Sequence, residues 1–192
     1  MQLADPTAEW NRNFKLLAVA TMGVGVFFGV QLTLFSNFIV DTFGIEAHEL
    51  GAMEALREVP GMLNVLLIAL LARRSLPVMG CLMLVVMGAG FMAYGGITTL
   101  YGLALFSFVW SIGFHGWIPL SQSMALRYSP PGRKGKWLGQ LRSVESVALL
   151  VSISACIIFL RSVDYTGMFI VAGGVTVLGG CALLGAKRQG AL

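Results

Sequence analysis

The sequence predicts an all-α membrane protein: a bundle of six transmembrane helices with both termini in the cytoplasm. Two observations lead to this prediction. Of the 192 residues, 57% are hydrophobic and only 11% are charged, and the mean hydropathy is +0.81. A soluble domain carries about 25% charged residues, so this composition excludes a soluble globule. The apolar residues also gather in runs of about 20, the length that crosses a bilayer core of about 30 Å.

Six apolar runs are long enough to span the membrane, and short polar connections separate them. They cover residues 16–40, 53–72, 76–94, 100–122, 141–160 and 165–186. None of the connections is long enough to hold a soluble domain, so residues 1–192 are predicted to form a single membrane domain. The lipid bilayer is therefore the first partner that the sequence predicts.

The positive residues between the runs predict the orientation. One set of connections carries nearly all of them: Arg12, Lys15, Arg73, Arg74, Arg127, Arg133, Lys134, Lys136, Lys187 and Arg188. The opposite set carries a single positive residue and several acidic ones: Arg161, Asp41, Glu46, Glu49 and Asp164. Because Lys and Arg accumulate in cytoplasmic loops, both termini and residues 127–136 are predicted to lie on the cytoplasmic side of the cell membrane. This topology accounts for the net charge of +4, and no nucleic-acid partner is needed to explain it.

The two halves of the chain resemble each other as an inverted repeat of three plus three helices, over about residues 16–94 and 100–186. Residues 50–57 and 138–145 both begin with Leu-Gly and continue with two opposite charges, with the signs exchanged. Gln31 and His115 match more weakly, each two residues after a glycine. Three helices separate the copies, so the copies run in opposite directions across the membrane, as in many transporters.

Further features of the sequence point to a known architecture. The second run contains Glu54 followed by Arg-Glu-Val-Pro-Gly at residues 57–61, and two of the connections are basic. With the six runs and the repeat, the chain resembles the amino-terminal half of a major facilitator superfamily transporter. The loop signature of that family is degenerate here, because Arg73 and Arg74 are present but its Asp and Gly are absent.

The resemblance has consequences for function and for partners. Members of that family have twelve helices, so it implies a second six-helix half or a second copy of this chain. It also implies that a small-molecule substrate crosses by alternating access, in secondary active transport. The substrate cavity would be lined by the first, second, fourth and fifth helices.

Five charged residues inside the predicted spans are the candidates for gating or proton coupling. Glu54, Arg57 and Glu58 fall at i, i+3 and i+4, on one face of the second predicted helix. Arg142 and Glu145 occupy the matching depth of the fifth. A charge at the centre of a spanning helix costs about 2.5–3.5 kcal/mol, so each one needs a reason. These residues either form the two mouths of a polar pathway or pair locally near the membrane surface.

Three further residues are candidates for binding the substrate or lining its cavity. Gln31 and His115 are the polar groups nearest the middle of the bilayer, and Trp117 follows two residues after His115. Histidine exchanges a proton near neutral pH, and both polar groups can hydrogen-bond a solute. The alternative is that they bond to neighbouring helices, as is also expected of Asn64.

Glycines predict close contacts between helices. Gly25 and Gly29 form a GxxxG spacing in the first predicted helix. The sixth predicted helix carries several more: Gly173, Gly174, Gly179, Gly180 and Gly185. Small residues at such spacings allow two backbones to approach closely. These contacts are expected within the bundle rather than between copies.

The sequence predicts no enzyme, no metal site and no cofactor. Ser111 and His115 share a helical face, but no serine protease motif surrounds them. The other histidine, His48, lies in a predicted outer loop, so no histidine pair is available for a metal. Two alternatives to a transporter stay open. One is a substrate-binding membrane subunit of an ATPase-driven uptake system, and the other is a structural membrane protein that transports nothing.

Overall fold

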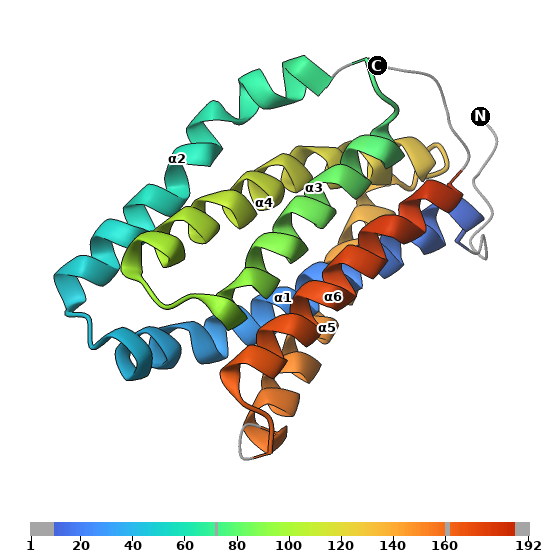
Figure 1. Ribbon diagram of the computed structural model, residues 1–192. Helices are drawn as coiled ribbons and strands as arrows, with labels where there is room; N and C mark the ends of the chain where they lie inside the picture. The colour runs from blue at the N-terminus through green and yellow to red at the C-terminus, as the bar shows by residue number, and fades with distance from the viewer. Residues whose placement is uncertain (1–9, 72, 160–161, 187–192) are drawn as a thin grey trace.

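The computed structural model describes residues 10–71, 73–159 and 162–186, and the regular structure in this part of the chain is helical. The elements follow in the order α1 (Arg12–Phe43), α2 (Ala47–Leu71), α3 (Leu76–Met92), η1 (Ala93–Gly96), α4 (Leu100–Tyr128), α5 (Lys134–Phe159), α6 (Tyr165–Ala182) and η2 (Leu183–Gly185). The long helices form one bundle, with α2 at its edge (Figure 1). The predicted all-α bundle is confirmed.

Five of the described helices are long and apolar enough to cross a membrane: α1, α3 with η1, α4, α5, and α6 with η2. These helices indicate an integral membrane protein. α2 differs because every 18-residue stretch of its 25 residues contains Glu54, Arg57 and Glu58. The second of the six predicted spans, and the orientation of the termini, therefore stay predictions. Of the positive residues that predict the orientation, Arg161, Lys187 and Arg188 lie outside the described residues.

Several helices extend beyond the predicted spans, so three connections, at residues 44–46, 97–99 and 129–133, are shorter than predicted. α5 already starts at Lys134, ahead of the predicted residue 141. Local capping determines such ends: the side chain of Asn11 accepts a hydrogen bond from the backbone N–H of Phe14 at the start of α1. Gly44 ends α1 with a φ of 60°, a left-handed conformation that favours glycine. Hydropathy cannot detect these polar ends because it marks only the apolar stretch.

The packing of the helices is symmetric in its pattern. α1 packs along α5 and α6, while α4 packs along α2 and α3. α3 and α6 pack against each other and so join the two sets. Exchanging α1 with α4, α2 with α5 and α3 with α6 leaves this set of pairings unchanged. Each half of the chain therefore contributes one central helix, one flanking helix and one helix of the shared α3–α6 contact.

Glycines allow the closest of these contacts. A Cβ atom on Gly25 or Gly29 would overlap the backbone or a side chain of α5. A Cβ atom on Gly113 would lie 2.5 Å from the backbone nitrogen of Met87 on α3. The GxxxG glycines of α1 therefore pack within the bundle, as expected.

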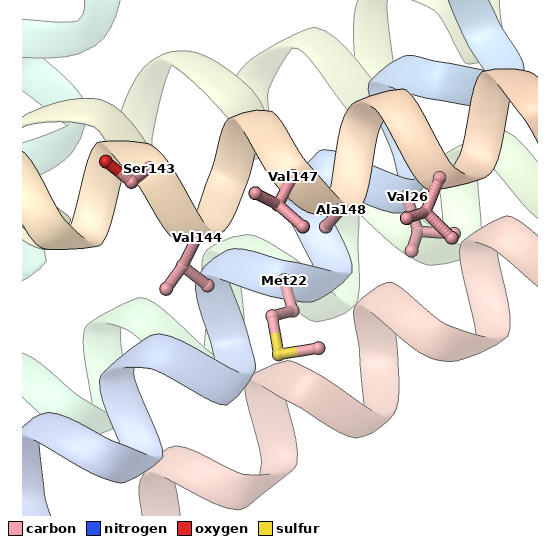
Figure 2. A pocket seen from close by; sticks show the side chains of 7 residues that line it. Met22, Val26, Ser143, Val144, Val147 and Ala148 are labelled. Atoms are coloured by element: carbon pink, nitrogen blue, oxygen red, sulfur yellow. The ribbon is translucent and has the colours of Figure 1, made fainter.

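An apolar groove of about 400 Å³ opens between α1 and α5 (Figure 2). Its walls are formed by Met22, Val26, Ser143, Val144, Val147, Ala148 and Val151. A second apolar groove of about 360 Å³ continues from it, because Val26 and Val151 line both, and it reaches α6 at Met168 and Val171. The two grooves form one apolar channel along the side of α5.

Candidate functional site

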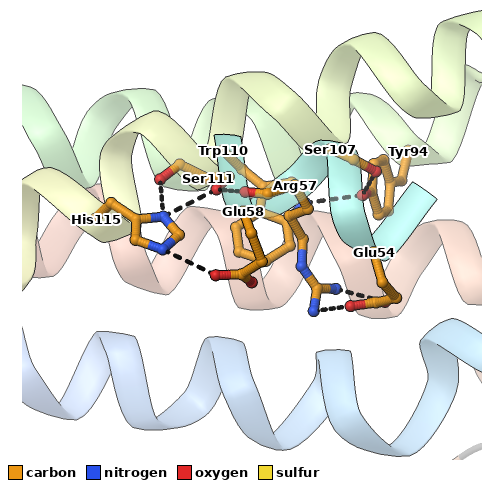
Figure 3. Close-up of polar contacts among 8 residues, drawn as sticks. All are labelled: Glu54, Arg57, Glu58, Tyr94, Ser107, Trp110, Ser111 and His115. Carbon is orange, nitrogen blue, oxygen red and sulfur yellow. Dashed lines mark hydrogen bonds and ion pairs between the residues drawn. The ribbon is translucent and has the colours of Figure 1, made fainter. Parts of the chain in front are cut away.

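A polar network joins α2 to α4 (Figure 3). It is formed by Glu54, Arg57 and Glu58 of α2, Tyr94 of η1, and Ser107, Trp110, Ser111 and His115 of α4. From the sequence, the charged residues of α2 and the histidine of α4 are predicted as separate candidates, for gating and for substrate binding. The structure brings them together at one contact between two helices.

Arg57 is held by a carboxylate and an aromatic ring. Its Nη1 donates a hydrogen bond of 2.8 Å to Oε1 of Glu54, and its Nη2 forms an ion pair with Oε2 of the same residue. The guanidinium carbon lies 5.2 Å from the centre of the Trp110 ring, within the range of a cation–π contact. The Arg57 side chain is only 18% exposed, so its charge is balanced by Glu54 and by the ring face.

A buried hydrogen-bonded pair fixes the ring on which Arg57 rests. Nε1 of Trp110 donates to the hydroxyl of Tyr94 over 2.8 Å. The Tyr94 hydroxyl also lies 2.5 Å from Oγ of Ser107. Trp110 and Tyr94 are almost fully buried, and these bonds satisfy polar atoms that would otherwise be costly to bury. The network therefore extends from the charged face of α2 into the core between α3 and α4.

His115 bridges the two helices through both of its ring nitrogens. Nε2 lies 3.3 Å from Oε2 of Glu58 on α2. Nδ1 lies 3.0 Å from Oγ and 3.1 Å from the carbonyl oxygen of Ser111, one turn earlier on α4. The Ser111 hydroxyl in turn donates to the backbone carbonyl of Arg57. The imidazole is only 15% exposed, whereas the Glu58 side chain is 65% exposed.

The contacts of His115 place hydrogen-bond acceptors around both ring nitrogens. A serine hydroxyl has a single hydrogen, and that of Ser111 is donated to the backbone carbonyl of Arg57. Nδ1 therefore faces two acceptors on Ser111, its hydroxyl oxygen and its carbonyl oxygen. Nε2 faces the carboxylate of Glu58 on the other helix.

Three residues shape the place that His115 occupies. Gly61 lies directly against the imidazole: a Cβ there would be 2.7 Å from Cδ2. Pro119 stands four residues after His115 and has no N–H, so the His115 carbonyl loses its usual helical partner. Nδ2 of Asn64 on α2 donates to that carbonyl over 2.8 Å. The hydrogen bond that proline removes from α4 is thus replaced by a donor from α2, and this bond holds the two helices in register.

The other four sequence candidates lie apart from this network. Trp117 is buried in the hydrophobic core, close to Gly80 of α3. Gln31 is buried on α1. Arg142 and Glu145 pair with each other on α5, where Nη1 of Arg142 donates to Oε2 of Glu145 over 2.7 Å.

Sequence reasoning missed the supporting residues of the site. Trp110 and Tyr94 read as ordinary core aromatics, and Ser111 entered only as a possible nucleophile. One signal in the sequence could have found the pairing with α2. Gly61 follows Glu58 by three residues and Asn64 follows Gly61 by three, so each lies beside the one before it on the helix surface: an acid, then a space, then a donor. Across the described residues, no three His, Cys, Asp or Glu side chains come close enough to hold a metal ion.

Comparison with known proteins gives a match in structure but none in sequence. No protein family and no curated protein matches the sequence. Among solved structures, the chain is similar to the human organic anion transporter MFSD10 (TETRAN), with a TM-score of 0.78 and 20% sequence identity. The match covers 94% of this chain and 43% of that one. The chain has the fold of one half of a major facilitator superfamily transporter. The predicted resemblance is confirmed at the level of the fold, and the chain spans less than half the length of the transporter it matches.

Proposed function

We propose that this chain is a six-helix half of a secondary active transporter, which moves a small solute across the cell membrane by alternating access. Its fold, shared with half of a known transporter, is the observation on which the proposal rests. The chain carries its ionisable network on α2 and α4, two of the four helices proposed to line the cavity. The matched protein is an organic anion transporter, so organic anions are the first class of solute to test.

The proposal includes a sixth membrane span formed by α2. Beyond its charged first half, the helix is apolar and presents large side chains on its exposed face, with Met62 84% and Leu70 81% exposed. The charged half turns Arg57 and Glu58 towards α4. An apolar outer face with charges directed at a neighbouring helix is how ionisable groups are accommodated inside a membrane.

Uptake and release of a proton by the Glu58–His115 pair is proposed to couple solute movement to a proton gradient. With the proton present, the two side chains attract each other across the α2–α4 contact. When the proton leaves, a neutral imidazole faces a carboxylate and that attraction weakens. One proton would therefore change the strength of the α2–α4 contact. Such a change can shift the equilibrium between conformations in which α2 and α4 are packed differently, as the site opens to one side of the membrane or the other.

The transporter is proposed to need a second six-helix unit, either a partner half or a second copy of the chain. α2 packs mainly on α4, and α5 packs mainly on α1. Both of these flanking helices expose large apolar residues. Each helix of the first half packs as its counterpart in the second half does. This agreement supports an inverted repeat over about residues 16–94 and 100–186. Such repeats commonly place the substrate site at the repeat interface near mid-membrane.

Transport can be tested in proteoliposomes loaded with a pH-sensitive dye. Organic anions, organic cations, amino acids and sugars are added outside in turn, and the proton flux that follows is recorded. We expect one class to drive a proton flux that depends on the protein, carried by an assembly of two six-helix units. Absence of flux with all four classes, from folded protein in a cross-linked two-unit assembly, would contradict the proposal. Transport by verified monomers would contradict the need for a partner.

The orientation can be tested by cysteine labelling. A single cysteine placed at Gly135, in the first turn of α5, is expected to react with a membrane-impermeant maleimide only from the cytoplasmic side. Gly135 is exposed, and a Cβ there would meet nothing within 4 Å, so the reagent can reach the site. A variant with cysteine at Thr98, between η1 and α4, is expected to react only from outside and serves as the control. Labelling of position 135 from outside intact cells would contradict the proposed topology.

A further inference from the structure

The apolar channel along α5 has a charged end and an uncharged interior. Five of the seven residues around its first groove are aliphatic: Val26, Val144, Val147, Ala148 and Val151. Met22 is apolar as well, and Ser143 lies at the end nearest the start of α5 (Figure 2). The second groove continues this surface towards α6. An occupant must therefore be apolar along most of its length.

Two lysines stand at the end of the groove, one on each of the helices that form it. Lys15 precedes Met22 by seven residues on α1, and Lys136 precedes Ser143 by seven on α5. Seven residues are close to two full turns, so each lysine lies on the same helical face as the lining residue that follows it. Both lysines are exposed, and neither forms an ion pair with another described residue.

The two lysines lie at one level of the bundle. The rings of Phe14 and Trp137, the immediate neighbours of Lys15 and Lys136, are in contact with centroids 4.5 Å apart. Close to this contact, Nε1 of Trp10, four residues before Phe14, donates to Oε1 of Gln140 over 2.9 Å. Tryptophans gather at the level of lipid headgroups, so this end of α1 and α5 has the composition of a membrane surface.

The dimensions fit a single leaflet. From Lys136 to Val151 the helix rises about 22 Å, at about 1.5 Å per residue. One leaflet with its headgroups is about 20–22 Å thick. A side chain at Lys136 would therefore meet a phosphate while Val151 lies near the bilayer middle.

We propose that the channel between α1 and α5 binds one anionic glycerophospholipid, with its phosphate between Lys15 and Lys136 and an acyl chain along the valines of α5. The nearby pair Arg142–Glu145 is internally neutral, with an N–O distance of 2.7 Å, so it does not offset the positive charge of the two lysines. The site is separate from the α2–α4 network, and the proposal does not depend on transport.

The test compares two lipids that differ only in headgroup charge. The full chain, delipidated in detergent, is incubated with equal amounts of phosphatidylglycerol and phosphatidylcholine carrying the same acyl chains. Bound lipid is counted by native mass spectrometry. A basic residue near the headgroups contributes about fivefold in binding of an anionic lipid, so the wild type is expected to prefer phosphatidylglycerol about 25-fold. Replacing both lysines (Lys15→Gln with Lys136→Gln) is expected to remove the preference.

Two further variants separate charge from shape. Lys134→Gln removes a charge from the same segment but lies on another face, because the residue seven places on is the buried Leu141, so it should keep most of the preference. Val147→Trp fills the groove from a side chain that is 60% exposed, and should lower retention of both lipids.

Three results would overturn the proposal. One is equal binding of the two lipids by the wild type, and another is an unchanged preference in the double lysine variant. The third is efficient disulfide cross-linking of two chains through Val147→Cys in membranes, which would show that a second copy covers the groove.

Discussion

Replacing Glu58 with glutamine is expected to slow solute-driven proton flux about tenfold or more, equivalent to about 1.4 kcal/mol in the barrier. The amide keeps the shape of the side chain, but it can neither carry the negative charge nor take up a proton. The Glu58 side chain is 65% exposed in this chain, so the loss of its ion pair should change stability by less than about 1 kcal/mol. Flux in proteoliposomes and the thermal midpoint in detergent measure the two effects separately.

Comparison with His115→Gln decides whether the two residues act as one unit. If they share a proton, the double variant should be no slower than the slower single variant, because the second change removes nothing further. Histidine is the side chain whose charge ordinarily changes between about pH 5 and 8. The pH dependence of the flux should therefore be present in the wild type and flattened in His115→Gln.

Glu46→Gln provides the matched control, since it removes a carboxylate that lies before α2 and is fully outside the network. It should leave both rate and pH profile unchanged. Additive losses in the double variant, or the same pH profile with and without His115, would show that the two residues work separately.

The fold could be predicted from the sequence because its main determinant is the apolar length of the helices. Hydropathy detects a run that fills the hydrocarbon region, and the five candidate spans all correspond to predicted runs. The ends of the helices could not be found in this way. The first turns of α5, from Lys134 onwards, are polar, and a polar segment before an apolar run gives the same hydropathy whether it is loop or helix.

The candidate site was predictable in its parts but not in its assembly. The spacing of Glu54, Arg57 and Glu58 predicts one helical face, since that depends only on helix geometry. Contact between Glu58 and His115 depends on how α2 and α4 pack, and the spacing of the charged residues does not specify it. The register is set by residues that look unremarkable in sequence, above all Gly61 and Asn64.

The glycines of α6 show the same limit. Gly173 and Gly174 are neighbours with identical chemistry, and a small-residue pattern treats them alike. In the structure a Cβ atom on Gly173 would overlap the backbone oxygen of Gly88 on α3, whereas one on Gly174 would meet nothing within 4 Å. Only the rotation of α6 about its axis distinguishes the two, and that rotation is a property of the packed bundle.

Gly173→Ala is therefore expected to destabilise the bundle, and Gly174→Ala is not. The methyl group at position 173 has to push α6 away from α3, and overpacking of this kind typically costs about 1–3 kcal/mol. At position 174 the methyl group enters open space, and alanine is favoured over glycine within a helix by about 0.5–1 kcal/mol. The thermal midpoint in detergent should fall by several degrees for Gly173→Ala and stay level or rise slightly for Gly174→Ala.

The adjacent pair is its own control, because both variants add one methyl group to the same turn of the same helix. Differences in expression, detergent binding or helix propensity affect the two alike, so their difference in midpoint reports the α3–α6 contact. A second variant at the facing position, Gly88→Ala, should destabilise in the same direction, since its Cβ would overlap the backbone oxygen of Gly173. Equal midpoints for Gly173→Ala and Gly174→Ala would mean that α6 is rotated from the position described, and that α3 and α6 do not meet through these glycines.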